Sequence, residues 1–149
     1  MRSRTVSSFM RDEDRADALT WLSYALGDLA EARSQPGQPS RPRIVAFHAQ
    51  QAAEKALKAA LVLSDVDPPR THELEQLRAL LPTDWRVRRN PRDIRRLSRH
   101  GVDARYPDDL EHVTSLAAAT AVRQAIAVVR LVREDFERRG VPTDKLAPR

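Results

Sequence analysis

The 149-residue sequence contains no cysteine, only four glycines and 5% aromatic residues. The missing cysteines exclude disulfide bonds and thiolate chemistry. The N-terminal stretch MRSRTVSSFMRDEDR lacks the apolar core of a signal peptide, and no apolar run approaches the roughly 18 residues that a membrane helix requires. P-loop, Gly-rich dinucleotide and Gly-x-Ser-x-Gly motifs are absent as well. These absences predict a soluble cytoplasmic protein that needs no cofactor and does not enter membranes.

Alanine, leucine, arginine and glutamate are abundant, and this composition favours helices over strands. Apolar residues recur at helical spacing in three long and two short segments. The predicted helices span about Asp14 to Arg33, Pro42 to Leu63, His72 to Leu81, Pro91 to His100, and Leu110 or Thr114 to Arg139. We therefore expect an all-α, up-and-down antiparallel bundle of four to five helices. It would be one domain, with a core at about 14–139 and tails at 1–13 and 140–149.

The second predicted helix contains the run FHAQQAAEKALKAAL, which is mostly apolar but keeps one polar line. That line consists of His48, Gln51, Lys55 and Lys58. Alanines on the remaining arc would let neighbouring helices approach closely, so this helix is expected at the centre of the bundle. The polar line would then face either solvent or a groove between two subunits.

Positive charge is concentrated in one segment. Between Trp85 and Arg105 the chain carries a net charge of +6, whereas the whole chain carries +5. Such a patch favours a polyanion such as RNA, because arginine suits phosphate geometry and binding releases counterions. A solvated arginine-rich surface is the plainer alternative. The predicted nucleic-acid-binding or phosphate-binding residues are Arg88, Arg89, Arg92, Arg96, Arg99, Lys55 and Tyr106.

Three motifs in order resemble the HEPN family of small helical domains, of the Arg-Tyr-Pro type associated with nucleotidyltransferases. They are FHAQQAAEKALKAALV, PPRTHELEQL and DARYPDD, and they precede a long final helix. The resemblance extends from about Trp21 to Phe136. It implies a helical bundle that pairs as a homodimer. It also implies that the chain acts on RNA as a metal-independent ribonuclease, or as a toxin paired with a small nucleotidyltransferase antitoxin.

The ribonuclease signature of that family is an arginine followed, after four to six residues, by a histidine near the start of the final helix. Four pairs satisfy the spacing here, and chance alone predicts about two in a sequence this rich in arginine. The pairs are Arg41 and His48, Arg43 and His48, Arg95 and His100, and Arg105 and His112. Position within the chain therefore decides between them.

Arg105 and His112 immediately precede the last helix, so they are the first choice of catalytic pair, and Arg95 and His100 are the second. The histidine could take a proton from a ribose 2′-hydroxyl or give one to the leaving 5′-oxygen. The arginine would stabilise charge on the phosphoryl oxygens, and no metal ion is needed. One histidine per chain supplies only one of the two proton transfers, so a dimer would complete the site.

Plainer interpretations exist for other residues. His72 is expected at the first turn of the short helix that Thr71 caps, rather than as a catalyst. Trp85 could stack on an unpaired base, although a core-edge position is commoner for tryptophan. Asp108 and His112 could share a helix face and bind a metal ion, but acidic residues at a helix start are explained by the helix dipole.

Two functions thus remain open. The first is an RNA-binding homodimer that cleaves RNA as the toxin of a two-gene module. The second is a non-catalytic module that binds a nucleotide or a protein, in which Arg105 holds a phosphate or a structural carboxylate. Fold membership alone does not decide between them, because function resides in the site.

Overall fold

The computed structural model describes residues 11–34, 41–101 and 112–149. Within these ranges all regular structure is helical, which confirms the all-α prediction. The helices are α1 (Asp12–Ala32), α2 (Pro42–Leu63), α3 (Leu74–Ala79), α4 (Arg86–Arg89), α5 (Arg95–Arg99) and α6 (Ser115–Arg138).

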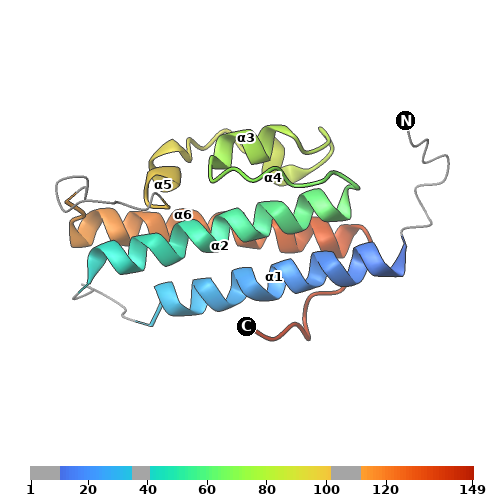
Figure 1. Ribbon diagram of the computed structural model, residues 1–149, viewed down its shortest axis with the longest axis horizontal. Helices are drawn as coiled ribbons and strands as arrows, with labels where there is room; N and C mark the ends of the chain where they lie inside the picture. Colours follow the sequence, from blue (N-terminus) through green and yellow to red (C-terminus); the bar gives the residue numbers. More distant parts are fainter. Residues whose placement is uncertain (1–10, 35–40, 102–111) are drawn as a thin grey trace.

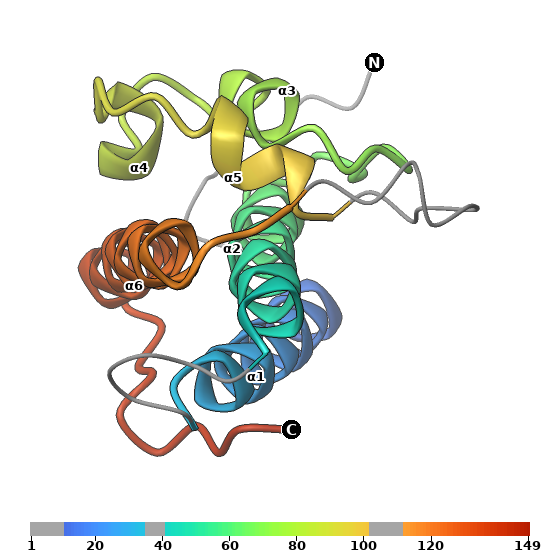
Figure 2. The same cartoon turned by 90° about the vertical axis from the view of Figure 1, so that its left-hand side faces the viewer.

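The three long helices lie side by side, and the three short ones cover one side of them (Figure 1). Seen end-on, α2 lies between α1 and α6, with α3, α4 and α5 above it (Figure 2). α1 and α2 are antiparallel, whereas α6 runs in the same direction as α2, because the chain returns along α3 to α5 before α6 begins (Figure 1).

α2 occupies the centre because alanine covers most of its circumference. Its alanines are fully buried, and their small side chains let α1 and α6 approach closely. The predicted bounds of this helix, Pro42 to Leu63, are confirmed. Residues that fill the core from other elements include Leu22, Leu74, Leu97, Val132 and Phe136.

The short helices differ from the prediction in number and position. The segment predicted as one helix from Pro91 to His100 is helical only from Arg95, because Asp93 Oδ1 accepts the Arg95 N–H at 2.9 Å in a local turn that precedes the helix. α4 is an additional turn that the sequence analysis missed. Thr71 does not cap α3, since its Oγ1 accepts the Glu73 N–H at 3.1 Å and the N-cap residue is Glu73.

The C-terminal segment was expected to be a loose tail, and this expectation is wrong. Gly140, with φ of 76°, ends α6, and the Gly140 and Val141 N–H groups donate to Glu137 and Phe136 carbonyls. Val141 is fully buried, and the Arg149 N–H donates to the Ser23 carbonyl of α1 at 2.9 Å. The segment therefore packs along the bundle.

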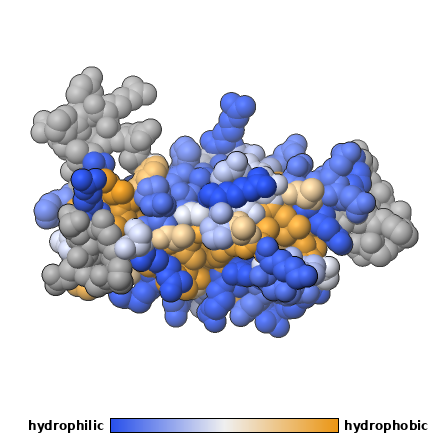
Figure 3. All heavy atoms as spheres, turned by 90° about the horizontal axis from the view of Figure 1, so that it is seen from below, coloured by the Kyte–Doolittle hydropathy of each residue, from blue (hydrophilic) through white to orange (hydrophobic). Residues whose placement is uncertain are grey.

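Among the described helices, α6 is the one long and apolar enough to cross a membrane by length and composition alone, which the sequence analysis missed. A core helix of a soluble protein meets the same criterion, and α6 packs on α2. Only 39% of the most apolar 18-residue stretch of α6 is buried. Seen from below, the molecule shows apolar residues in a lengthwise band between hydrophilic ones (Figure 3).

Candidate functional site

The polar line of α2 joins this helix to α1. His48 Nδ1 lies 3.1 Å from Asp28 Oδ1, and Lys55 Nζ donates to Asp28 Oδ2 at 2.6 Å. The Lys55 ammonium also lies 5.9 Å from the centre of the Tyr24 ring. Lys55, predicted to bind phosphate, is thus half-buried and already paired with a carboxylate.

A second polar cluster lies on the neighbouring arc of α2, around Gln50 and Glu54. The Glu54 side chain is only 5% exposed, yet three groups donate to it: His72 Nδ1 at 2.8 Å, Gln50 Nε2 at 3.1 Å and Lys58 Nζ at 3.1 Å. Burial alone would raise the pKa of Glu54, but these hydrogen bonds outweigh it and hold the pKa below its ordinary value. Glu54 therefore stays ionised inside the fold.

The Glu54 cluster connects α2 to the loop before α3 and to the end of α5. Gln50 Nε2 also donates to the His72 carbonyl at 3.3 Å. A Cβ on Gly101 would lie 2.4 Å from Gln50 Cδ, so the backbone after α5 rests on this amide. His72 was expected at the first turn of α3, but it precedes the helix and binds Glu54 instead. Glu54 and Lys58 form an ion pair across one turn of α2.

The arginine-rich surface is carried by α4 and α5. Trp85, Val87, Ile94 and Leu97 anchor these short helices in the core, and the arginines between the anchors point outward. Trp85 is 1% exposed, which confirms the core reading of this residue over base stacking. The arginines exposed on this surface are Arg86, Arg89, Arg92, Arg95, Arg96 and Arg99.

Most of these arginines keep their charge uncompensated. Within the described ranges, Arg86, Arg89, Arg92, Arg96 and Arg99 make no ion pair. Arg88 is half-buried and its Nε donates to the Ala79 carbonyl at 3.4 Å. The arginine surface therefore presents several free guanidinium groups. The helices α4 and α5 that carry it lie on one side of the bundle (Figure 1).

The second-choice catalytic pair, Arg95 and His100, lies at the two ends of α5. Arg95 forms a two-pronged ion pair with Asp93, which lowers the pKa of that carboxyl to about 2. Arg95 opens α5 and His100 follows its last residue. Positions five apart on a helix diverge by about 140° around its axis, so the two side chains leave α5 in different directions.

Of the first-choice pair, His112 is exposed and lies two residues before Thr114, whose Oγ1 accepts the Ala117 N–H and caps α6. Arg105, Tyr106 and Asp108 lie outside the described residues. No group of three or more potential metal-ligating side chains occurs in the described part of the chain.

Sequence reasoning missed Gln50, Asp28 and the burial of Glu54. A signal was present for two of them, because Gln50 and Glu54 interrupt an arc of α2 that is otherwise mostly apolar, with Ala46, Ala53 and Leu57. A polar residue at such a position indicates a buried hydrogen-bonded group.

The HEPN domain profile matches residues 18–135. This chain belongs to the HEPN domain family. Its helical bundle is similar to the crystal structure of TT1696 from Thermus thermophilus, at 28% sequence identity and a TM-score of 0.63. The similarity covers 78% of this chain and 96% of the other. No curated protein matches the sequence. The HEPN resemblance inferred from the three motifs is thus confirmed.

Proposed function

We propose that this HEPN-domain protein binds RNA through the arginine surface of α4 and α5. The supporting observation is that five exposed arginines of this surface make no ion pair in the described part of the chain: Arg86, Arg89, Arg92, Arg96 and Arg99. Free guanidinium groups gain from phosphate contact without first losing an intramolecular partner. Each contact that neutralises a phosphate releases counterions, so binding should weaken steeply as salt rises.

The test is fluorescence anisotropy of a labelled single-stranded RNA over a series of salt concentrations. Replacing Arg92 and Arg96 together with alanine should reduce the slope of log affinity against log salt by about 1.4, or about 0.7 per contact. Arg15→Ala is the matched control, because it removes an exposed arginine from α1, on the opposite side of the bundle. Equal slopes for parent and double variant would contradict the proposal.

We also propose that the protein cleaves RNA without a metal ion, with Arg105 and His112 as the acting pair. Support comes from the family membership and from the exposure of His112 just before α6. Incubation of total RNA with the protein in excess chelator tests the activity. His112→Ala should abolish cleavage and leave RNA affinity nearly unchanged. If His100→Ala abolishes cleavage instead, the pair is Arg95 and His100.

The alternative is a non-catalytic module that binds a nucleotide or a protein. Binding of RNA with no cleavage in chelator or in magnesium would favour it. The toxin proposal has its own check: a gene for a small nucleotidyltransferase next to this gene would support it, and co-purification of the two proteins would test the pairing directly.

We further propose that the protein is a homodimer and acts in the cytoplasm. Leu116 on α6 is 73% exposed, and Ile126 farther along the helix is only partly buried. A pocket beside Ile126 is lined by Leu26 and Leu29 of α1. Burying this surface between two copies would remove apolar area from water. Ile126→Glu should convert a dimer to a monomer in light scattering, whereas Thr83→Glu, at an exposed position between α3 and α4, should not.

A further inference from the structure

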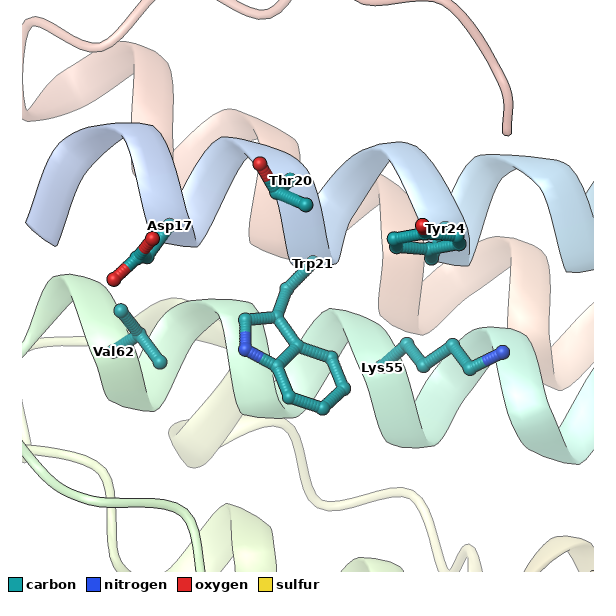
Figure 4. Close-up of a pocket in the computed structure, with 6 residues that line it drawn as sticks. All are labelled: Asp17, Thr20, Trp21, Tyr24, Lys55 and Val62. Atoms are coloured by element: carbon teal, nitrogen blue, oxygen red, sulfur yellow. The ribbon is translucent and has the colours of Figure 1, made fainter. Parts of the chain in front are cut away.

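The outer face of α1 and α2, away from α6, carries a pocket that the proposed function does not use. Its volume is about 410 Å³, within the range of ligand pockets. The lining residues are Asp17, Thr20, Trp21, Tyr24, Lys55 and Val62. The Trp21 indole lies in the middle, with Asp17 and Val62 at one end and Tyr24 and Lys55 at the other (Figure 4).

The aromatic walls of this pocket are accessible. Tyr24 is 45% exposed, and Trp21 is only partly buried. Lys58 Nζ lies 5.7 Å from the centre of the Trp21 ring, so the indole already makes one cation–π contact. The Lys58 side chain is only 11% exposed, so that contact lies inside the fold and the pocket stays open.

The charges around the pocket favour a cation over an anion. Lys55 is neutralised by Asp28 at 2.6 Å, and Lys58 by Glu54 at 3.1 Å. Asp17 makes no ion pair within the described ranges, so it is the lining group whose charge remains uncompensated. An anionic ligand would have to displace a carboxylate from a lysine, whereas a cation would meet a free carboxylate beside the Trp21 ring.

The whole of α1 strengthens this preference. The helix carries six acidic residues and one arginine, a net charge of −5, in a protein whose total is +5. The acidic residues are Asp12, Glu13, Asp14, Asp17, Asp28 and Glu31. α1 lies on the opposite side of the bundle from the arginine surface (Figure 1). A basic partner would therefore be attracted to α1 and repelled from α4 and α5.

We propose that this pocket binds an arginine side chain of a basic polypeptide segment that docks along α1. A guanidinium is planar and can stack on the Trp21 indole while its N–H groups donate to the Asp17 carboxylate. Arginine suits this site better than lysine, because stacking and two-pronged carboxylate binding both need a flat, forked cation. The interaction is independent of RNA binding, which uses the other side of the molecule.

The test is titration of the isotope-labelled protein with a short peptide of alternating arginine and glycine, followed by NMR. The Trp21 indole N–H signal should shift, and the signal of Trp85, which is 1% exposed, should not. A peptide with citrulline in place of arginine keeps the planar group but lacks the charge and should bind at least fivefold more weakly. Equal binding of the citrulline peptide would overturn the proposal.

Two variants locate the binding site. Asp17→Asn should weaken the arginine peptide about fivefold, as expected for one exposed ion pair beside an aromatic ring. Asp12→Asn removes an equal charge from the same helix outside the pocket and should change affinity less than twofold. Equal losses of peptide affinity in the two variants would show that the peptide is attracted only by the overall charge of α1, which would overturn the proposal. Tighter binding of adenosine monophosphate than of the peptide at Trp21 would overturn it as well.

Discussion

His72 Nδ1 lies 2.8 Å from Glu54 Oε1, which joins the loop before α3 to the centre of α2. Because an ionised carboxylate can only accept, the proton of this hydrogen bond must sit on His72 Nδ1. The pair fixes one ring nitrogen of His72, while 67% of the histidine side chain remains exposed. Glu54 thus holds the loop to α2 and also binds Gln50 and Lys58 of its own helix.

Glu54→Gln should destabilise the protein. The substitution removes the charge that His72 and Lys58 contact, and hydrogen bonds to a charged group contribute about 1.5 to 3 kcal/mol when buried. The melting temperature should fall by about 2 to 4 °C for each kcal/mol lost. Glu31→Gln, an exposed carboxylate on α1, is the matched control and should change the melting temperature by less than about 2 °C, as expected for a surface site.

The same pair predicts a pH dependence. The pKa of Glu54 lies below its ordinary value, so its contribution to stability is fully present above about pH 4.3 and is lost as the pH falls through the lowered pKa. Glu54→Gln has no carboxyl at this position. The stability difference between parent and variant should therefore be constant near neutral pH and shrink below about pH 4. A difference that grows on acidification would contradict an ionised Glu54.

Gly101→Ala should disturb the same cluster by steric means. A Cβ at this position would lie 2.4 Å from Gln50 Cδ, and Gln50 is fully buried and hydrogen-bonded, so it cannot move freely. We expect a cost of about 1 to 3 kcal/mol, typical of overpacking. In a Gln50→Ala background the cost should largely disappear. Gly140→Ala is the control, because its cost arises from a φ of 76° and should not depend on Gln50.

Gly27→Ala should release the chain end with little change in overall stability. A Cβ at Gly27 would overlap the Arg149 carbonyl, so the hydrogen bond from Arg149 to Ser23 would be lost, at about 0.5 to 1.5 kcal/mol. Alanine is more favourable than glycine in a helix interior by about 0.8 to 1 kcal/mol, which offsets this loss. The melting temperature should stay nearly constant, while amide exchange at Arg149 accelerates. Exchange at the buried Thr143 should not change.

The long helices were predictable because their apolar periodicity is local to each segment. Pro42 at the first turn and Leu63 at the last bound α2 as the pattern indicated, and Gly140 ends α6 as expected. The polar line of α2 was also visible, but its partner Asp28 is twenty residues from His48 along the chain. Periodicity says which face a residue occupies and does not identify the residue opposite.

α4 and the C-terminal segment could not be predicted for a similar reason. A four-residue turn has almost no periodicity, and contacts from α6, forty-nine residues later along the chain, hold it in place. The C-terminal segment is rich in turn-forming residues, and this composition is typical of a loose tail. Its burial depends on Val141 and Thr143, which are buried in the folded structure. Arg105 and Tyr106 lie outside the described residues, so the first-choice catalytic site stays a prediction.

Asp135 explains how α4 is attached. Its carboxylate is fully buried and accepts the Arg86 and Val87 N–H groups, each at 3.2 Å, together with Arg138 Nη1 at 2.9 Å. The free N–H groups at the start of a helix attract a negative charge, so Asp135 holds α4 against α6. Above the same turn, the Arg139 guanidinium lies 3.9 Å from the centre of the Trp85 ring.

Asp135→Asn should therefore destabilise the protein and loosen the arginine surface together. In asparagine, an NH2 group replaces one of the two carboxylate oxygens and cannot accept a hydrogen bond. One of the two backbone N–H groups of α4 would therefore lose its partner, at a cost of about 1 to 3 kcal/mol. Amide exchange at Arg86 and Val87 should accelerate more than at Leu57 in α2, and RNA affinity should fall because Arg89 is no longer held in place. Asp144→Asn, an exposed carboxylate after α6, should change neither quantity. Unchanged exchange at Val87 in Asp135→Asn would show that the buried Trp85 and Val87 side chains hold α4 without Asp135.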